Sequence, residues 1–354
     1  MDSHKILVIG DLHIKANNIS DIQSLTLQIK ELIVKNNYSF VVLLGDTLDS
    51  HERMHMVVYN YAVNFITDLC KITRVFLLIG NHDRVNNTDF QSNIHPFVGL
   101  QYTPNLHIIH RAQKFQIQNF KYIFVPYVPV GSFDSALQSI ETEIHINSDN
   151  LDLSDMVELD TGILNNVSVV FAHQEFKGVN LNNKKSNSSD VWILNNPLLI
   201  SGHIHEYSKL QPNLIYTGTP IQHTFAENPD KSVSELIVSK NEVNHNRIYL
   251  QNRKKITVNI QYNEISNFDI CNYLDSYIKL IINGTNSELK SLVKNTFIEK
   301  LSLAGVKIKY NNIDKPEINN TVNLNLKNVS YLENLEAKIK DSHNLYILYK
   351  KILN

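Results

Sequence analysis

The chain has 354 residues, of which 43% are hydrophobic and 19% charged, and its formal net charge is -2. This length allows a large catalytic domain and a smaller second one, and the hydrophobic content excludes a disordered protein. A weakly acidic chain is no general nucleic-acid binder, so such a partner would need a local positive patch or bound cations. The two cysteines lie far apart and no apolar run could cross a bilayer. We therefore expect no membrane partner and a reduced intracellular location, in the cytoplasm, nucleoid or nucleus.

Hydrophobic strands alternate with amphipathic helices over the first 205 residues. The pattern predicts strands at 5–10, 40–44, 75–79, 122–125, 167–171 and 197–201, and helices at 24–35, 56–69 and 133–144. A polar and acidic loop is expected at 147–166. Most strands are apolar on both faces, which favours an α/β fold with a largely parallel interior.

Five of these strands end directly before residues that bind metal ions or transfer protons. The blocks are Asp11-Leu12-His13, Gly45-Asp46, Gly80-Asn81-His82-Asp83, Ala172-His173 and Gly202-His203-Ile204-His205. A single aspartate after a strand is more often a turn or cap residue, and a single buried histidine is usually only hydrogen-bonded. Five blocks at strand ends favour a site instead, because the strand ends of α/β sheets converge on one crevice.

Carboxylate, imidazole and amide ligands without thiolates suit Mn²⁺, Fe²⁺ or Zn²⁺. The candidates are too many for one closed site and suit a pair of ions. His203 and His205 project to the same side of an extended segment, so they could bind neighbouring ions. Two ions about 3.5–4 Å apart can polarise a phosphoryl group, and a histidine that binds no metal is the natural proton donor. The sequence therefore predicts metal-assisted hydrolysis of a phosphoester.

In residues and order, these blocks resemble the five motifs of the calcineurin-like metallophosphoesterase superfamily. The resemblance implies a two-sheet α/β sandwich with helices outside and a binuclear site for divalent ions. Manganese is the first expectation, with iron, zinc or magnesium as alternatives. By the same resemblance one ion is bound by Asp11, His13, Asp46 and His205, and the other by Asn81, His173 and His203, with Asp46 bridging them. His82 is then the unligated acid and Asp83 the residue that orients it.

Three stretches resemble the SbcD-type DNA repair nucleases, which include the recombination nuclease subunit of T-even phages; a virus or phage is thus among the expected sources. They are Gly45-Asp46-Thr47-Leu48-Asp49, His173-Gln174-Glu175-Phe176-Lys177-Gly178 and Tyr216-Thr217-Gly218-Thr219-Pro220. Two other branches of the superfamily fit less well. Asp83 replaces the glutamate of phosphoprotein phosphatases, and Asp49 stands where purple acid phosphatases have a ligand tyrosine. Arg53 and Met54 depart from the Arg-Pro that usually follows the second motif.

The sequence pattern after residue 250 predicts a small α+β unit and a helical tail. Strands are expected at 256–260, 277–282 and 306–310, and helices at 288–303 and 331–353. We divide the chain into a metallophosphoesterase catalytic domain (1–250), an α+β capping domain (251–325) and a tail (326–354). Basic residues that could contact phosphates are Arg253, Lys254, Lys255, Lys184 and Lys185, and a solvated turn explains each equally well.

In the SbcD-type nucleases the cap steers DNA, the tail docks on a coiled-coil SbcC-like ATPase, and the protein forms a homodimer. DNA, such an ATPase and a second copy are therefore the implied partners, although the tail could equally pack on its own cap. The leading hypothesis is a metal-dependent DNA nuclease subunit acting in end processing, recombination or repair. A stand-alone phosphodiesterase or phosphatase for a small nucleotide is the alternative, since cyclic-nucleotide enzymes share the motifs Asp-x-His, Gly-Asn-His-Asp and Gly-His-x-His. A non-catalytic scaffold is disfavoured, because buried carboxylates without metal are costly.

Overall fold

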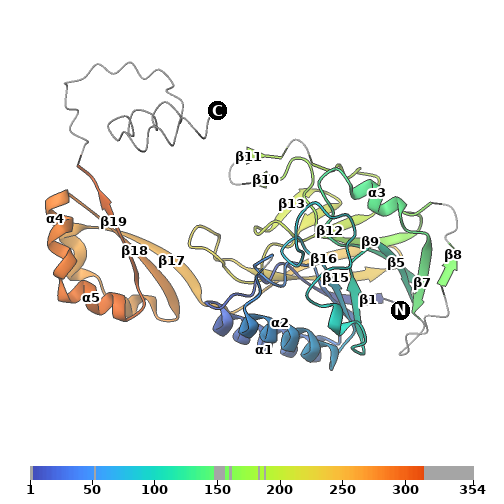
Figure 1. Cartoon of the computed structure of the whole chain (residues 1–354), viewed down its shortest axis with the longest axis horizontal. Coiled ribbons are helices and arrows are strands. Elements are labelled where there is room, and N and C mark those ends of the chain that lie inside the picture. Colours follow the sequence, from blue (N-terminus) through green and yellow to red (C-terminus); the bar gives the residue numbers. More distant parts are fainter. Residues whose placement is uncertain are drawn as a thin grey trace, which may run out of the picture.

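The computed structural model describes residues 3–51, 53–146, 156–158, 162–181, 184–186 and 189–314. They form two stacked mixed sheets with helices outside, and a smaller third sheet beside them (Figure 1). Among these residues, no helix combines the length and the apolar character that crossing a membrane requires.

The first sheet has six strands in the order β16-β15-β1-β2-β3-β4. Their bounds are β1 (Ser3–Ile9), β2 (Phe40–Leu43), β3 (Val75–Leu78), β4 (Leu106–Ile109), β15 (Ser232–Ser239) and β16 (Val243–Tyr249). Strands β1 to β4 are parallel, while β15 and β16 are added antiparallel. Helices α1 (Ile19–Asn36) and α2 (Met56–Cys70) cover the outer face and bury their apolar stripes against it.

The second sheet has eight strands in the order β13-β14-β12-β9-β6-β5-β7-β8. Their bounds are β5 (Gln113–Ile117), β6 (Phe120–Val125), β7 (Thr142–Ile146), β8 (Met156–Glu158), β9 (Val167–Ala172), β12 (Leu198–Ser201), β13 (Ser208–Gln211) and β14 (Leu214–Tyr216). The central strands β6, β9, β12 and β14 are parallel. Helix α3 (Phe133–Gln138) packs on the outer face, and β10 (Asn180–Leu181) pairs with β11 (Lys184–Lys185).

An aromatic core joins the two sheets. Because side chains alternate along a strand, Ile6 and Val8 of β1 point into the sandwich while Leu7 and Ile9 face the helices. Phe76, Phe124 and Phe171 stack in sequence across the sandwich, with ring centroids 4.3 and 5.2 Å apart. This packing aligns the carboxyl ends of β1, β2 and β3 with those of β9 and β12.

The third sheet consists of β17 (Lys254–Gln261), β18 (Ser276–Gly284) and β19 (Lys307–Asn312), all parallel. Helices α4 (Asn286–Ser291) and α5 (Thr296–Leu303) pack on it and share its own hydrophobic cluster. Short 3₁₀ helices lie at Val98–Leu100, Tyr262–Asn267, Ile270–Tyr273 and Leu292–Lys294.

Two helix predictions need correction. The helix expected at 133–144 ends at Gln138, and residues 142–146 form β7, because they pair with β5 in a parallel register. The helix expected at 288–303 is broken, because the Asn295 side chain accepts hydrogen bonds from the backbone N–H groups of Phe297 and Ile298 and begins α5 there.

The interior is largely parallel as predicted, in β1 to β4 and in β6, β9, β12 and β14. Both large sheets are nevertheless mixed, because they carry antiparallel strands that the sequence did not reveal. The loop expected at 147–166 contains β8, and its residues 147–155 and 159–161 lie outside the described residues. The predicted tail helix at 331–353 also lies outside them.

Candidate metal centre

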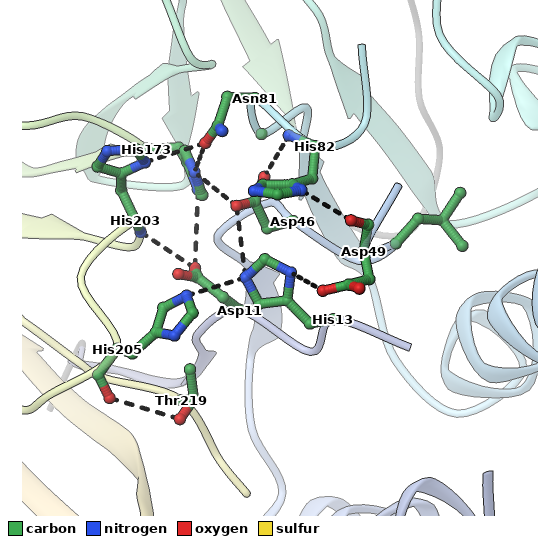
Figure 2. Close-up of polar contacts among 12 residues, drawn as sticks. Asp11, His13, Asp46, Asp49, Asn81, His82, His173, His203, His205 and Thr219 are labelled. Atoms are coloured by element: carbon green, nitrogen blue, oxygen red, sulfur yellow. Dashed lines mark hydrogen bonds and ion pairs between the residues drawn. The ribbon is translucent and has the colours of Figure 1, made fainter. Parts of the chain in front are cut away.

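The loops that follow β1, β2, β3, β9 and β12 meet at one edge of the sandwich (Figure 2). The structure brings together there all of the predicted site residues: Asp11, His13, Asp46, Asn81, His82, Asp83, His173, His203 and His205. This is the expected outcome for parallel strands, whose carboxyl ends lie on the same side of a sheet.

Three of the site residues adopt left-handed backbone conformations that non-glycine residues rarely take. The φ angles are 41° for His13, 48° for Asp46 and 77° for His203. Such conformations cost about 1–3 kcal/mol each and persist only where the surroundings enforce them. The backbone N–H of His13 donates to the carbonyl of Asp46 at 2.9 Å, which joins the first two loops. The loops are therefore held in strained shapes that aim their side chains inward.

Two glycines allow the carboxylates to reach their positions. A Cβ atom on Gly80 would overlap the Asp46 carboxylate, and one on Gly202 would lie 2.5 Å from Asp11 Oδ1. Any larger residue at either position would push a carboxylate out of the site, which gives a physical reason for the glycine in these motifs.

The first group of possible ligands contains Asp11, His13 and His205. The Nε2 atoms of His13 and His205 face each other at 3.0 Å. Asp11 is fully buried, and its Oδ2 atom has no hydrogen-bond partner among the described residues. A buried carboxylate oxygen without a partner is costly, and a cation at this position would satisfy it.

The second group contains Asn81, His173 and His203. Asn81 Oδ1 lies 3.0 Å from His173 Nε2 and 2.9 Å from His203 Nδ1. The other ring nitrogen of His173, Nδ1, donates to the carbonyl of Leu44 at 2.8 Å, so the lone pair of Nε2 points into the site. An N–H bond to a carbonyl is the usual way in which proteins fix the tautomer of a metal-binding histidine.

Asp46 lies between the two groups. Its Oδ2 atom is 3.4 Å from His173 Nε2 and 3.6 Å from His13 Nε2, while Oδ1 accepts the backbone N–H of His82 at 2.8 Å. Asp46 forms one group of possible ligand atoms with His13 and His82 and another with His173 and His203. Within each group these atoms lie within 4.8 Å of one another. One carboxylate therefore reaches both groups, as a bridging ligand must.

The electrostatics of the site suit cations. Burial lowers the pKa values of His203 and His205 to about 4 each, so both imidazoles are neutral near pH 7 and offer lone pairs. Burial would raise the pKa of Asp46, but the neighbouring His173 and His13 imidazoles outweigh it and hold that pKa well below its usual range. Burial raises the pKa of Asp11 to about 6, and a divalent ion would favour its charged form. The described residues thus form a buried site of histidines and aspartates. Their donor atoms are of the types that bind a pair of divalent metal ions.

His82 and Asp83 lie beside these two groups, and each has backbone hydrogen-bond partners. The His82 ring is held by the backbone carbonyl of Asp49, which accepts from Nδ1 at 2.9 Å (Figure 2). The Asp83 carboxylate accepts the backbone N–H groups of Thr47, Leu48 and Gly80 at 3.0–3.2 Å. That Asp83 orients His82 stays a prediction, and the contacts show an indirect route for it. The Asp83 carboxylate fixes the loop whose Asp49 carbonyl holds the ring.

Sequence reasoning missed two residues at the site. Asp49 was part of a motif, but its carboxylate lies 3.3 Å from His13 Nδ1 and 2.8 Å from Lys15 Nζ, so it helps to fix the His13 ring. The His223 ring packs against His13 and His205, with centroids 5.1 and 5.5 Å away. It follows the Tyr216–Pro220 turn, and no spacing rule marks it in the sequence.

Comparisons with known proteins agree with this geometry. Residues 4–207 match the family model described as Calcineurin-like phosphoesterase. Protein 244L of Invertebrate iridescent virus 6, provisionally named a phosphoesterase, is 34% identical over 302 residues, which cover 84% of this chain and 100% of that protein. Protein 078R of Invertebrate iridescent virus 3, with the same provisional name, is 30% identical over 90% of this chain and 88% of its own. An uncharacterized protein of Acanthamoeba polyphaga mimivirus, R555, is 23% identical over 97% of this chain and 26% of its own.

Replacing the shared carboxylate tests the arrangement. The variant Asp46→Ala is expected to weaken Mn²⁺ binding at both positions and to abolish phosphoester turnover, because Asp46 contacts both groups of imidazoles. Equilibrium dialysis with metal analysis measures the stoichiometry, which we expect to fall from two ions per chain.

The matched control is Asp134→Ala, which removes an exposed carboxylate from α3 and should leave the stoichiometry unchanged. Two tightly bound ions in Asp46→Ala would contradict the bridging role.

Proposed function

The chain belongs to the calcineurin-like phosphoesterase family and is a metal-dependent phosphoesterase, and from this premise we propose that it cleaves the phosphodiester bonds of DNA. The observation that carries the phosphoester chemistry is the buried Asp46 carboxylate between two sets of imidazoles. The motif details that resemble SbcD-type nucleases support DNA as the substrate. The third sheet supports it too, because it brings the basic residue Lys255 and the aromatic residue Tyr277 against Asp21 of the catalytic body.

We assign one ion to Asp11, His13, Asp46 and His205, and the other to Asp46, Asn81, His173 and His203. When bound, the ions act as Lewis acids toward the phosphoryl group and the attacking water. The residues of the chain hold these ligands rigidly, through the strained loops and the hydrogen bond from His173 to Leu44. Manganese remains the first choice of metal, with iron, zinc or magnesium as alternatives.

His82 is assigned as the proton donor to the leaving oxygen. Its Nδ1 is bound to the Asp49 carbonyl, so the second proton of the imidazolium sits on Nε2, which is free to donate it. Burial lowers the pKa of His82, which makes the imidazolium a stronger acid. His82 also lies within 4.8 Å of the ligand atoms of His13 and Asp46, so its role as an acid must be distinguished from that of a ligand.

We further propose that the protein acts in end processing, recombination or repair together with an SbcC-like ATPase, and that it forms a homodimer. The ATPase proposal concerns residues 326–354, which lie outside the described residues. It rests on the resemblance to SbcD-type nucleases alone.

A direct assay tests the choice of substrate. Purified protein with Mn²⁺ is expected to cleave both linear duplex DNA and bis-nitrophenyl phosphate, and EDTA should abolish both reactions, because both need the metal centre. Asp46→Ala is the negative control for contaminating nucleases. Cleavage of the small ester alone would contradict the DNA proposal and favour a small-nucleotide phosphodiesterase. Cleavage of neither would favour a scaffold.

A second variant separates acid from ligand. His82→Gln is expected to slow turnover by about 10²–10⁴-fold and to leave the metal content at two ions per chain. Kinetics with bis-nitrophenyl phosphate and metal analysis of the same preparation measure the two effects. A loss of metal equal to that of Asp46→Ala would show that His82 is a ligand.

A further inference from the structure

A cavity of about 320 Å³ lies between the catalytic body and the third sheet, next to the metal centre. Three segments that are distant in the sequence form its walls. The lining residues that matter below are Lys15, His223, Phe225, Lys255, Tyr277 and Lys307. The volume lies at the lower end of the range typical for small-molecule sites, and it suits a ligand of the size of one nucleotide.

The lining carries a local positive charge in a chain whose net charge is -2. Lys15, Lys255 and Lys307 line the cavity, with Asp21 as the acidic residue among the lining groups. Lys15 pairs with Asp49, and Lys255 lies 3.9 Å from Asp21. Lys307 has no carboxylate within ion-pair distance among the described residues, so its charge is free to meet an anion. This is the local positive patch that an acidic chain needs in order to hold phosphate.

Two aromatic side chains share the cavity with these cations. The Tyr277 hydroxyl donates to Asp21 Oδ1 at 2.9 Å, which fixes the ring between the third sheet and α1. The Phe225 ring is half-buried, and Lys307 Nζ lies 5.5 Å from its centroid. Aromatic faces beside lysines are the usual means of binding nucleotides without sequence preference, because every base has a face that stacks.

His223 forms the wall between the cavity and the metal centre. The His223 ring packs edge-on against the His13 and His205 rings, with interplanar angles of 83° and 63°. Both of its ring nitrogens are buried, and neither has a hydrogen-bond partner among the described residues. A buried imidazole nitrogen without a hydrogen-bond partner costs free energy, and a ligand that reached the ring would supply that partner. Lys15, only two residues from His13, continues the same wall.

We propose that this cavity binds one nucleotide of the substrate strand, beside the phosphodiester that reacts at the metal centre. Lys255 and Lys307 contact its phosphate, Phe225 and Tyr277 contact its base, and a ring nitrogen of His223 forms a hydrogen bond with it. The inference rests on the proposed function, since it takes the substrate to be a nucleic-acid strand. Of the basic residues that the sequence marked, Lys255 lines the cavity and Arg253 packs on the Tyr277 ring, 4.2 Å from its centroid.

Calorimetric titration with thymidine 3′,5′-bisphosphate in EDTA tests the cavity without the metal ions. The full chain is expected to bind the probe. Lys307→Glu and Phe225→Ala should each weaken binding about tenfold, because they remove a phosphate contact and a stacking surface. Lys294→Glu, the same charge change at an exposed position of the third-sheet unit outside the cavity, should bind like wild type, as should Tyr102→Ala.

Thermal unfolding of each variant establishes that it is folded. No binding by wild type, or wild-type affinity in both Lys307→Glu and Phe225→Ala, would overturn the cavity proposal whatever the nuclease assay shows. If the probe binds with the expected variant pattern but duplex DNA is not cleaved, the nucleotide site is supported and the proposed DNA substrate is wrong.

Discussion

The Asp46 carboxylate is buried at the meeting point of two groups of imidazoles, and its charge sets the conditions for the site around it. A carboxylate removed from water is stable only when cations or hydrogen bonds replace the lost hydration. Here Oδ1 has the backbone N–H of His82, while Oδ2 faces His13 and His173. Asp11, equally buried, leaves one oxygen without a partner. Burial would lower the pKa of His173, but the Asp46 and Asp11 carboxylates outweigh it and raise that pKa to about 9, which shows how strongly the two buried carboxylates attract positive charge.

The rest of the fold maintains this arrangement. The stacked aromatic core keeps the two sheets in a fixed register, so loops from both sheets face each other across a short distance. Asp83 ties the loops after β2 and β3 by accepting backbone N–H groups from each, and in this way it fixes the carbonyl that holds His82. The glycines at 80 and 202 leave room for the carboxylates. The site is therefore rigid before any ligand arrives, which is what transition-state stabilisation by fixed charges requires.

The site could be predicted from the sequence to a greater extent than the fold. Each ligand block follows a strand that is apolar on both faces, so local pattern and strand polarity together bring Asp11, Asp46 and His173 to one edge. Strands β15 and β16 escaped prediction, because β15 pairs antiparallel with β1 across more than 200 positions of sequence and β16 joins the sheet through β15. His223 escaped for a similar reason, since only the folded turn places it against His13. Side-chain partners such as that of Asp83 depend on loop geometry that spacing does not reveal.

The most direct test of the metal centre is anomalous diffraction from crystals of the protein grown with Mn²⁺. We expect two manganese peaks, one beside Asp11, His13 and His205 and the other beside Asn81, His173 and His203, both in contact with Asp46. A map without peaks there, or with a single peak that Asp46 does not touch, would contradict the binuclear site.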